Sequence, residues 1–301
     1  MWFKNLQIYR LPQNWPITAD ALEKLLAGRS LQPCGATDCR QAGWINPCSH
    51  AGLVHSLNRQ WLLALGIEQK LLPSTVIRQE ARNRAQDIHE KEGRRIGRKE
   101  MRDLCERVTQ ELLPRAFIQK RTLFGWIDPV NGWLVIDAAS AAKAEEFLEH
   151  LYQSVDGLPA RPLKTNQSPS AVMTSWLEQG EAPAPFTLDM DLELRSAEDA
   201  RIRYVRHSLE GEEIRRHILE GKAVTRLAMT WADRISFVLD DKLQIKRLAF
   251  LDILKEESDT QAENEETRFD LDFTLMTGEI SRLLDDLLEA LGGEATTEAT
   301  A

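Results

Sequence analysis

Apolar residues recur about every second position before Ser74 and about every fourth position after it. Before it, Leu6 and Ile8 alternate with polar neighbours, which predicts a strand. After it, Gly93 and Gly97 separate two runs of apolar residues at helical spacing, namely Ile77, Ala81, Ala85 and Ile88, then Met101, Leu104, Val108 and Leu112. The pattern predicts a helical hairpin. Because its apolar stripe is narrow, we expect it to project from the body.

The remaining pattern mixes helices with strands. Strands are expected over 60–65 and 69–72, meeting in a turn at Gly66, and over 122–127 and 132–136, which flank the turn sequence Asp128-Pro129-Val130-Asn131-Gly132. Thr18 or Asp20 should cap a helix through 21–26, and another helix should cover 141–151. Further on we expect helices over 170–177, 212–220 and 279–291 and strands over 201–206, 223–229, 235–239 and 243–250. Elements that cluster in this way predict an α+β fold of mixed sheets with packed helices.

The length of 301 residues suits two core-bearing units. Residues 160–167, which contain Pro162 and are soon followed by Pro169, are the best linker candidate. We therefore expect a first α+β unit formed by residues 1–73 and 118–165, interrupted by the hairpin at 74–117. A second α+β unit with an acidic C-terminal region should follow over residues 166–301.

Charge is sorted along the chain. Residues 76–121 carry thirteen Lys or Arg against eight Asp or Glu, although the whole chain has a formal charge of −9. From residue 252 onward, fifteen Asp or Glu face three Lys or Arg. Such sorting can present a local positive field to a polyanion while the protein stays soluble. The alternative is that the basic run is a solvated helical face of mixed charge.

Familiar catalytic patterns are absent from the sequence. We find neither a phosphate-binding glycine loop nor a nucleophile elbow nor a zinc-protease helix, so we expect no enzyme activity, no catalytic residues and no cofactor. A metal site built from Cys34, Cys39, Cys48 and His50 lacks the usual close ligand pairs, so no metal is expected. With no signal peptide and no apolar run long enough for a membrane span, the chain is expected in the cytoplasm.

Arginines on helical faces remain as the candidate chemistry. Arg95, Arg98 and Arg102 are spaced to share one face of the second hairpin helix. A second basic stretch runs from 201 to 226. Arginines with few interleaved aromatic residues suit contact with phosphates better than base stacking, which predicts binding of nucleic acid without sequence preference.

Motifs spread along nearly the whole chain resemble those of the proteobacterial RdgC family of recombination-associated proteins. The matching segments are MWFKNLQIYRL at the start, Pro33-Cys34-Gly35, Gly43-Trp44, Lys70-Leu71-Leu72-Pro73-Ser74, Leu112-Leu113-Pro114-Arg115-Ala116-Phe117, Trp126-Ile127-Asp128, Val130-Asn131-Gly132, Leu227-Ala228 with Trp231, Leu275-Met276-Thr277-Gly278-Glu279 and Leu291-Gly292-Gly293-Glu294-Ala295. The resemblance implies a horseshoe subunit with centre, tip and base regions. Two such subunits would close into a ring-shaped homodimer around double-stranded DNA, with single-stranded DNA as a further candidate.

The resemblance also implies a role. Members restrain RecA in recombination and in replication-fork repair, which would associate the protein with the nucleoid. It assigns Phe117 to the gate of the ring and places Arg206 and His207 where the family commonly has a Lys-Gln pair. The full set of candidate DNA-binding residues is Arg78, Arg82, Arg95, Arg98, Arg102, Arg203, Arg206, His207, Arg215 and Arg216.

Two other functions compete with this one. The hairpin could dock on an acidic recombination protein, with DNA contact secondary. Alternatively, the acidic residues between Glu263 and Asp272 could serve a metal-dependent nuclease, although they have no fold-specific spacing and fit a solvated face better. Salt-dependent binding to DNA of unrelated sequences would favour the DNA-binding function over the first alternative. Mg²⁺-dependent strand cleavage would support the second alternative.

Overall fold

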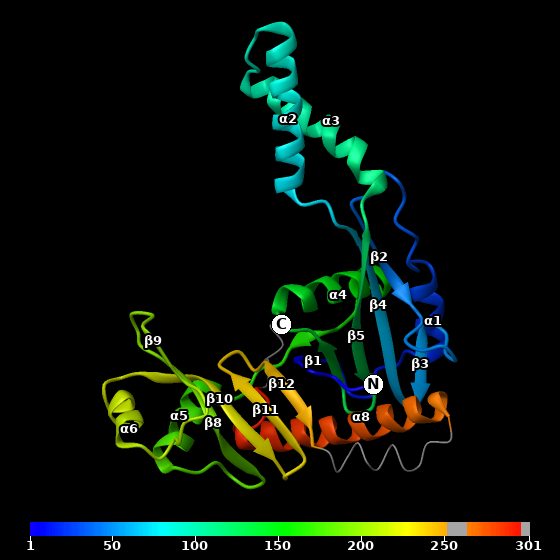
Figure 1. The fold of residues 1–301 in the computed structure, drawn as a ribbon. Helices are drawn as coiled ribbons and strands as arrows, with labels where there is room; N and C mark the ends of the chain where they lie inside the picture. The colour runs from blue at the N-terminus through cyan, green and yellow to red at the C-terminus, as the bar shows by residue number, and fades with distance from the viewer. Residues whose placement is uncertain (252–263, 296–301) are drawn as a thin grey trace, which may run out of the picture.

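A computed structural model describes residues 1–251 and 264–295 of the chain (Figure 1). Glu263 and the rest of the acidic run at 252–263 lie outside these residues. The described part contains seven α-helices: α1 Ala19–Ala27, α2 Ser74–Glu92, α3 Arg98–Leu112, α4 Ala141–Ser154, α5 Pro169–Gln179, α6 Glu212–Leu219 and α8 Glu265–Ala290. Among the described helices, none is both long enough and apolar enough to cross a membrane.

Twelve strands form one sheet. They are β1 Leu6–Arg10, β2 Arg40–Ile45, β3 Val54–Leu57, β4 Gln60–Lys70, β5 Ile118–Asp128, β6 Trp133–Asp137, β7 Arg161–Pro162, β8 Phe186–Arg195, β9 Arg201–Tyr204, β10 Ala223–Trp231, β11 Ile235–Asp240 and β12 Ile245–Phe250. The order is β2-β4-β5-β6-β1-β12-β11-β10-β8-β9, with β3 on β4 and β7 on β1. The α+β class is confirmed. The expectation of mixed sheets is wrong, because every pair of these strands is antiparallel.

The sheet has a thin junction. Strand β1 meets β12 through a single residue pair, Leu6 with Ile245, and the Leu248 amide donates to the Lys4 carbonyl nearby. The segment after α4 contains β7, which pairs with β1. The division into units at 1–73, 74–117, 118–165 and 166–301 stays a prediction.

The half of the sheet around β4, β5 and β6 is covered on both faces. Neighbouring residues of β6 point to opposite sides: Trp133 and Val135 join the large core that includes α5 and α8, whereas Leu134 and Ile136 join the core under α1 and α4. A strand covered on both faces reads as a continuous apolar run rather than an alternation. Strand β6 shows this, because its first four residues are buried.

The other half, β8 to β12, is covered on one face only. Ile235, Phe237 and Leu239 of β11 are buried in the core with α5 and α8, while Ser236 and Val238 between them are partly exposed. This alternation is the expected pattern for an antiparallel sheet with one open face. Helix α8 runs along both halves of the sheet (Figure 1).

Gly66 does not form the expected turn. It lies in the middle of β4, where the sequence predicted two separate strands. A β-carbon at this position would lie 2.8 Å from a methyl carbon of Ile45 and 2.9 Å from one of Leu31. The glycine therefore permits close packing over a strand interior. Strands β2, β3 and β8, which were not among the expected elements, are also part of the sheet.

Candidate nucleic-acid interface

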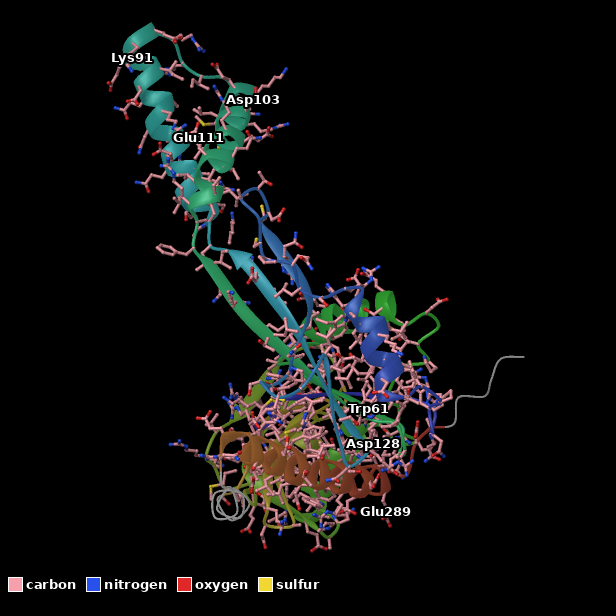
Figure 2. All side chains as sticks on the ribbon, turned by 90° about the vertical axis from the view of Figure 1, so that its right-hand side faces the viewer. Trp61, Lys91, Asp103, Glu111, Asp128 and Glu289 are labelled. Carbon is pink, nitrogen blue, oxygen red and sulfur yellow. The ribbon has the colours of Figure 1, made fainter. Side chains whose placement is uncertain are left out.

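Helices α2 and α3, with the residues between them, form a segment that we call the arm (residues 74–112). Its two helices pack together through a small core of Ala81, Leu104 and Val108. Figure 1 shows the arm extending away from the sheet, and in Figure 2 Lys91, Asp103 and Glu111 lie on it, far from Trp61 and Asp128 in the body. So small a core leaves most of the arm's side chains in solvent.

The acidic residues of the arm hold some of its arginines in ion pairs. Arg84 lies 2.9 Å from Glu80 and 2.8 Å from Glu111, and hydrogen bonds from Arg84 lower the pKa of the Glu111 carboxyl. Arg94 lies 2.6 Å from Glu92 and 2.7 Å from Glu100. These two guanidinium groups are therefore already neutralised by partners on the arm.

Six other arginines of the arm are exposed and form no ion pair with any residue that the structure describes: Arg107, which was not among the predicted residues, and the predicted Arg78, Arg82, Arg95, Arg98 and Arg102. The expectation that the last three share one helical face is wrong for Arg95. Gly93 ends α2 in the left-handed conformation, with φ of 68°, and α3 begins only after Gly97, so Arg95 lies in the connecting loop. Arg98 and Arg102, four residues apart, do share a face.

The first turn of α3 is unusual. It carries Arg98 and Lys99 beside Glu100, although cations near a helix N-terminus oppose the helix dipole by about 0.3–1 kcal/mol each. The capping residue is Gly97, which provides no side chain to the free amide groups there. Exposed amide donors beside uncompensated arginines are the elements of an anion-binding site.

The second predicted stretch spreads over several elements. Arg203 lies on β9 and Arg206 follows this strand with φ of 51°, its amide donating to Asp191 at 3.0 Å. His207 lies 3.2 Å from a carboxylate oxygen of Glu213, and its ring lies 5.2 Å from that of Tyr204. On α6, Arg216 pairs with Glu220 at 3.6 Å, whereas Arg215 forms no ion pair with described residues. All five candidates are exposed, namely Arg203, Arg206, His207, Arg215 and Arg216.

The open face of β8 to β12 carries a row of alternating charge, which we call the charge ladder (Arg203, Glu193, Arg226, Asp240 and Lys246). Strand register places Glu193 opposite both Arg203 and Arg226, and Arg226 opposite Asp240. Arg226 lies 3.3 Å from Glu193, and Lys246 lies 3.3 Å from Asp240. The basic side chains of this face are thus largely balanced by acids, which reduces the positive field expected from the 201–226 stretch.

The base of the arm exposes a group of apolar side chains, the neck patch (Leu71, Val76, Phe117 and Ile118). Phe117 is 84% exposed, so it does not pack into the core of its own chain. Its carbonyl accepts a hydrogen bond of 2.8 Å from the Leu71 amide, which holds the two residues side by side. Leu71 and Val76 are about half exposed, at 50% and 46%. Large apolar side chains gathered in solvent mark an interaction surface.

Comparison with known proteins identifies the family. A family model described as "Putative exonuclease, RdgC" matches residues 1–294. The chain belongs to the RdgC family. A protein named "Recombination-associated protein RdgC" from Herminiimonas arsenicoxydans is 56% identical over 296 residues, which cover 98% of this chain and 99% of the relative.

Two further relatives carry the same name. The one from Janthinobacterium sp. (strain Marseille) is 53% identical over 98% of this chain and 99% of its own length. The one from Dechloromonas aromatica is 50% identical over 98% of each chain. The resemblance drawn from sequence motifs is confirmed, and association with recombination is a property that RdgC relatives carry in their names.

Proposed function

We propose that this chain binds the sugar–phosphate backbone of double-stranded DNA without sequence preference, as a non-enzymatic protein. The observation that carries the proposal is the set of six exposed arginines of the arm that have no acidic partner among described residues. Arginine is suited to phosphate because its guanidinium group stays charged and can donate two parallel hydrogen bonds. Contacts from these arginines to phosphate groups would carry no sequence information, which is why we propose binding without sequence preference.

The uncapped start of α3 supports the same proposal. Arg95 and Arg98 flank Gly97, so a phosphate placed there would meet guanidinium groups and free helix amides together. The local electrostatic cost of Arg98 at a helix N-terminus would then be offset in the complex. The ion-paired Arg84 and Arg94 would contribute less, since each would have to give up a carboxylate partner.

We further propose that two subunits close into a ring around the DNA, with Phe117 as the gate. The neck patch supports this, because an aromatic side chain that is 84% exposed can serve as an anchor in a pocket of a second subunit. A closed ring of two subunits needs a second contact. The large exposed apolar residues Met190, Val205 and Leu219, on β8, after β9 and at the end of α6, are candidates for it.

Restraint of RecA and association with the nucleoid complete the proposal. A ring that occupies duplex DNA would limit access by a recombinase, so direct contact with RecA is not required. The alternative, in which the arm docks on an acidic recombination protein, uses the same arginines. It differs because the arm would then bind that protein in the absence of DNA.

The deciding experiment measures binding of the full-length protein to two duplexes of unrelated sequence by fluorescence anisotropy at several salt concentrations. We expect equal affinities and a linear fall of log K with log salt concentration. Binding that depends on sequence, or that does not respond to salt, would contradict the proposal. The same duplexes, incubated with Mg²⁺ and run on a denaturing gel, should stay intact. Shortened strands would support the exonuclease function that the family model's description carries.

A further inference from the structure

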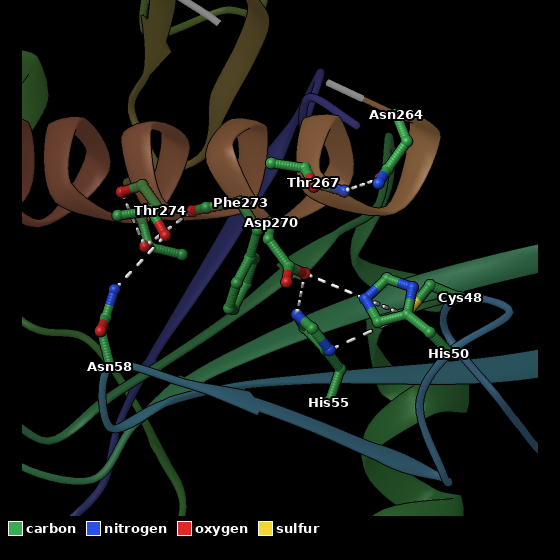
Figure 3. Close-up of polar contacts among 10 residues, drawn as sticks. Cys48, His50, His55, Asn58, Asn264, Thr267, Asp270, Phe273 and Thr274 are labelled. Carbon is green, nitrogen blue, oxygen red and sulfur yellow. Dashed lines mark hydrogen bonds and ion pairs between the residues drawn. The ribbon is translucent and has the colours of Figure 1, made fainter. Parts of the chain in front are cut away.

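Three potential metal ligands meet beside the N-terminal part of α8 (Figure 3). Cys48 and His50 lie between β2 and β3, and His55 lies on β3. One donor atom from each of the three residues lies within 4.8 Å of the other two. We call these residues the histidine cluster. Asp270 approaches it from α8, 220 residues away from His50 in the sequence.

The spacing of the donor atoms matches that of ligands around one ion. The Cys48 sulfur lies 3.7 Å from His50 Nε2 and 3.7 Å from His55 Nδ1. In a tetrahedral zinc site with bonds near 2.3 Å to sulfur and 2.0–2.1 Å to nitrogen, these separations would be roughly 3.6 Å. The sulfur thus lies at ligand distance from a nitrogen of each ring.

Burial makes the tautomer of His55 matter. The His55 side chain is only 7% exposed, and its Nε2 atom has no aligned hydrogen-bond partner among the described residues, although it lies 3.2 Å from an Asp270 oxygen. A buried ring nitrogen without a partner is costly. Phe269 and Phe273 pack edge-on against His55, at ring distances of 5.5 and 5.3 Å, and shield the cluster on the α8 side.

We propose that Cys48 Sγ, His50 Nε2 and His55 Nδ1 bind a zinc ion. The mixed sulfur and nitrogen donors suit Zn²⁺ better than Mg²⁺ or Ca²⁺, which prefer oxygen. A metal bound to Nδ1 makes His55 Nε2 a hydrogen-bond donor. A small rotation of the Asp270 side chain would let its carboxylate accept this hydrogen bond. A metal-bound histidine usually donates its other ring nitrogen to a carboxylate in this way.

The ion would connect distant parts of the chain. It would join the segment between β2 and β3 to strand β3 directly, and both to α8 through Asp270, which lies 3.2 Å from His55 Nε2. Binding of the ion would displace the proton of the Cys48 thiol to solvent, because a coordinated thiol is deprotonated. The site is independent of the proposed DNA-binding surface.

No metal site was expected from the sequence because Cys48 and His50 were considered together with Cys34 and Cys39. Cys34 donates instead to the Asp38 carbonyl at 3.3 Å, and Cys39 is exposed. The usable pattern is Cys48-x-His50 followed by His55, and Asp270 is brought to it only by the fold. Cys34 and Cys39 therefore serve as controls on the same chain.

The test titrates the full-length protein, freed of metal with a chelator, with Co²⁺. We expect a thiolate-to-cobalt charge-transfer band that saturates with one ion per chain and disappears on addition of Zn²⁺. Cys48→Ser should abolish the band, whereas the double variant Cys34→Ser/Cys39→Ser should keep it. Asp270→Asn should weaken metal binding about 10- to 100-fold, the effect typical of a lost outer-shell carboxylate.

Zn²⁺ should also raise the unfolding temperature of the wild type and of the double variant, but not that of Cys48→Ser, because only a ligand bound to the folded state stabilises it. Circular dichroism checks that Cys48→Ser is folded. If that variant does not fold, the wild-type titration still decides, since the band and its displacement by Zn²⁺ need no variant. Absence of the band in the wild type, or a full band in folded Cys48→Ser, would overturn the proposal.

Discussion

Replacing three arginines at the start of α3 and in the preceding loop should flatten the salt dependence of DNA binding. The variant is Arg95→Gln/Arg98→Gln/Arg102→Gln. These side chains are exposed and have no acidic partner among described residues, so each is free to release one counterion from DNA. Each lost phosphate contact lowers the log–log slope by roughly 0.9 for duplex DNA, and three lower it by about 2.7.

The size of the effect follows from that slope. Between 50 and 200 mM salt, the wild type should lose about 40-fold more affinity than the triple variant. The assay is fluorescence anisotropy on two duplexes of unrelated sequence, and the loss should be the same on both. Folding should be unaffected, because removing exposed groups without partners usually changes stability by less than about 0.5 kcal/mol.

A matched control is available on the same arm. Arg94→Gln removes the same charge next to Arg95, but Arg94 already pairs with Glu92 and Glu100. We expect this control to change the slope by much less than one contact. The reasoning is refuted if the triple variant keeps the wild-type slope, or if Arg94→Gln alters the slope as much as Arg95→Gln does.

Three further changes test other parts of the structure. Phe117→Ala should leave the melting temperature nearly unchanged, while retention on covalently closed circular DNA falls; a lower melting temperature with unchanged retention would make Phe117 ordinary core. Arg234→Ala should lower the free energy of unfolding, measured in urea, by about 3 kcal/mol, because it takes a hydrogen-bonded partner from the carboxylate of Glu279, which is 1% exposed. Unchanged stability would show that Arg282 compensates. Glu265→Gln/Glu266→Gln, at the start of α8, should modestly raise DNA affinity at low salt, and no change would make these residues merely solubilising.

Where one physical cue dominated, the sequence was sufficient to predict the local structure. The narrow stripe from Ile77 to Leu112 and the two glycines predicted α2 and α3, and the turn at Asp128 predicted the pairing of β5 with β6. Asp128 accepts hydrogen bonds from the amides of Val130 and Asn131, which is the local turn geometry that its position suggested.

Some elements were missed although their pattern is present in the sequence. No strand was expected over 186–195, yet Phe186 to Arg195 alternates apolar and polar residues at every position, the pattern of β8. The helix expected over 279–291 begins earlier, at Glu265, where Asn264 caps it by accepting from the Thr267 amide. Glu265 and Glu266 lie in its first turn and are exposed, which agrees with the solvated face expected for them.

Other features depend on the fold and could not come from local patterns. The approach of Asp270 to His50 and His55 joins residues more than 200 positions apart. Likewise, only strand register shows that Glu193 lies between Arg203 and Arg226. Counting charges along a segment cannot reveal which of them already have partners.

That distinction decides where a polyanion should bind. The 201–226 stretch is rich in arginine, yet Arg226 is paired with Glu193, and the next positions of the charge ladder, Asp240 and Lys246, pair with each other. On the arm, four of the eight acids pair with Arg84 and Arg94, and the remaining arginines project into solvent without partners among described residues. Since counterion release requires a free charge, we expect the arm to supply more of the salt-dependent binding than the open sheet face, despite similar numbers of basic residues.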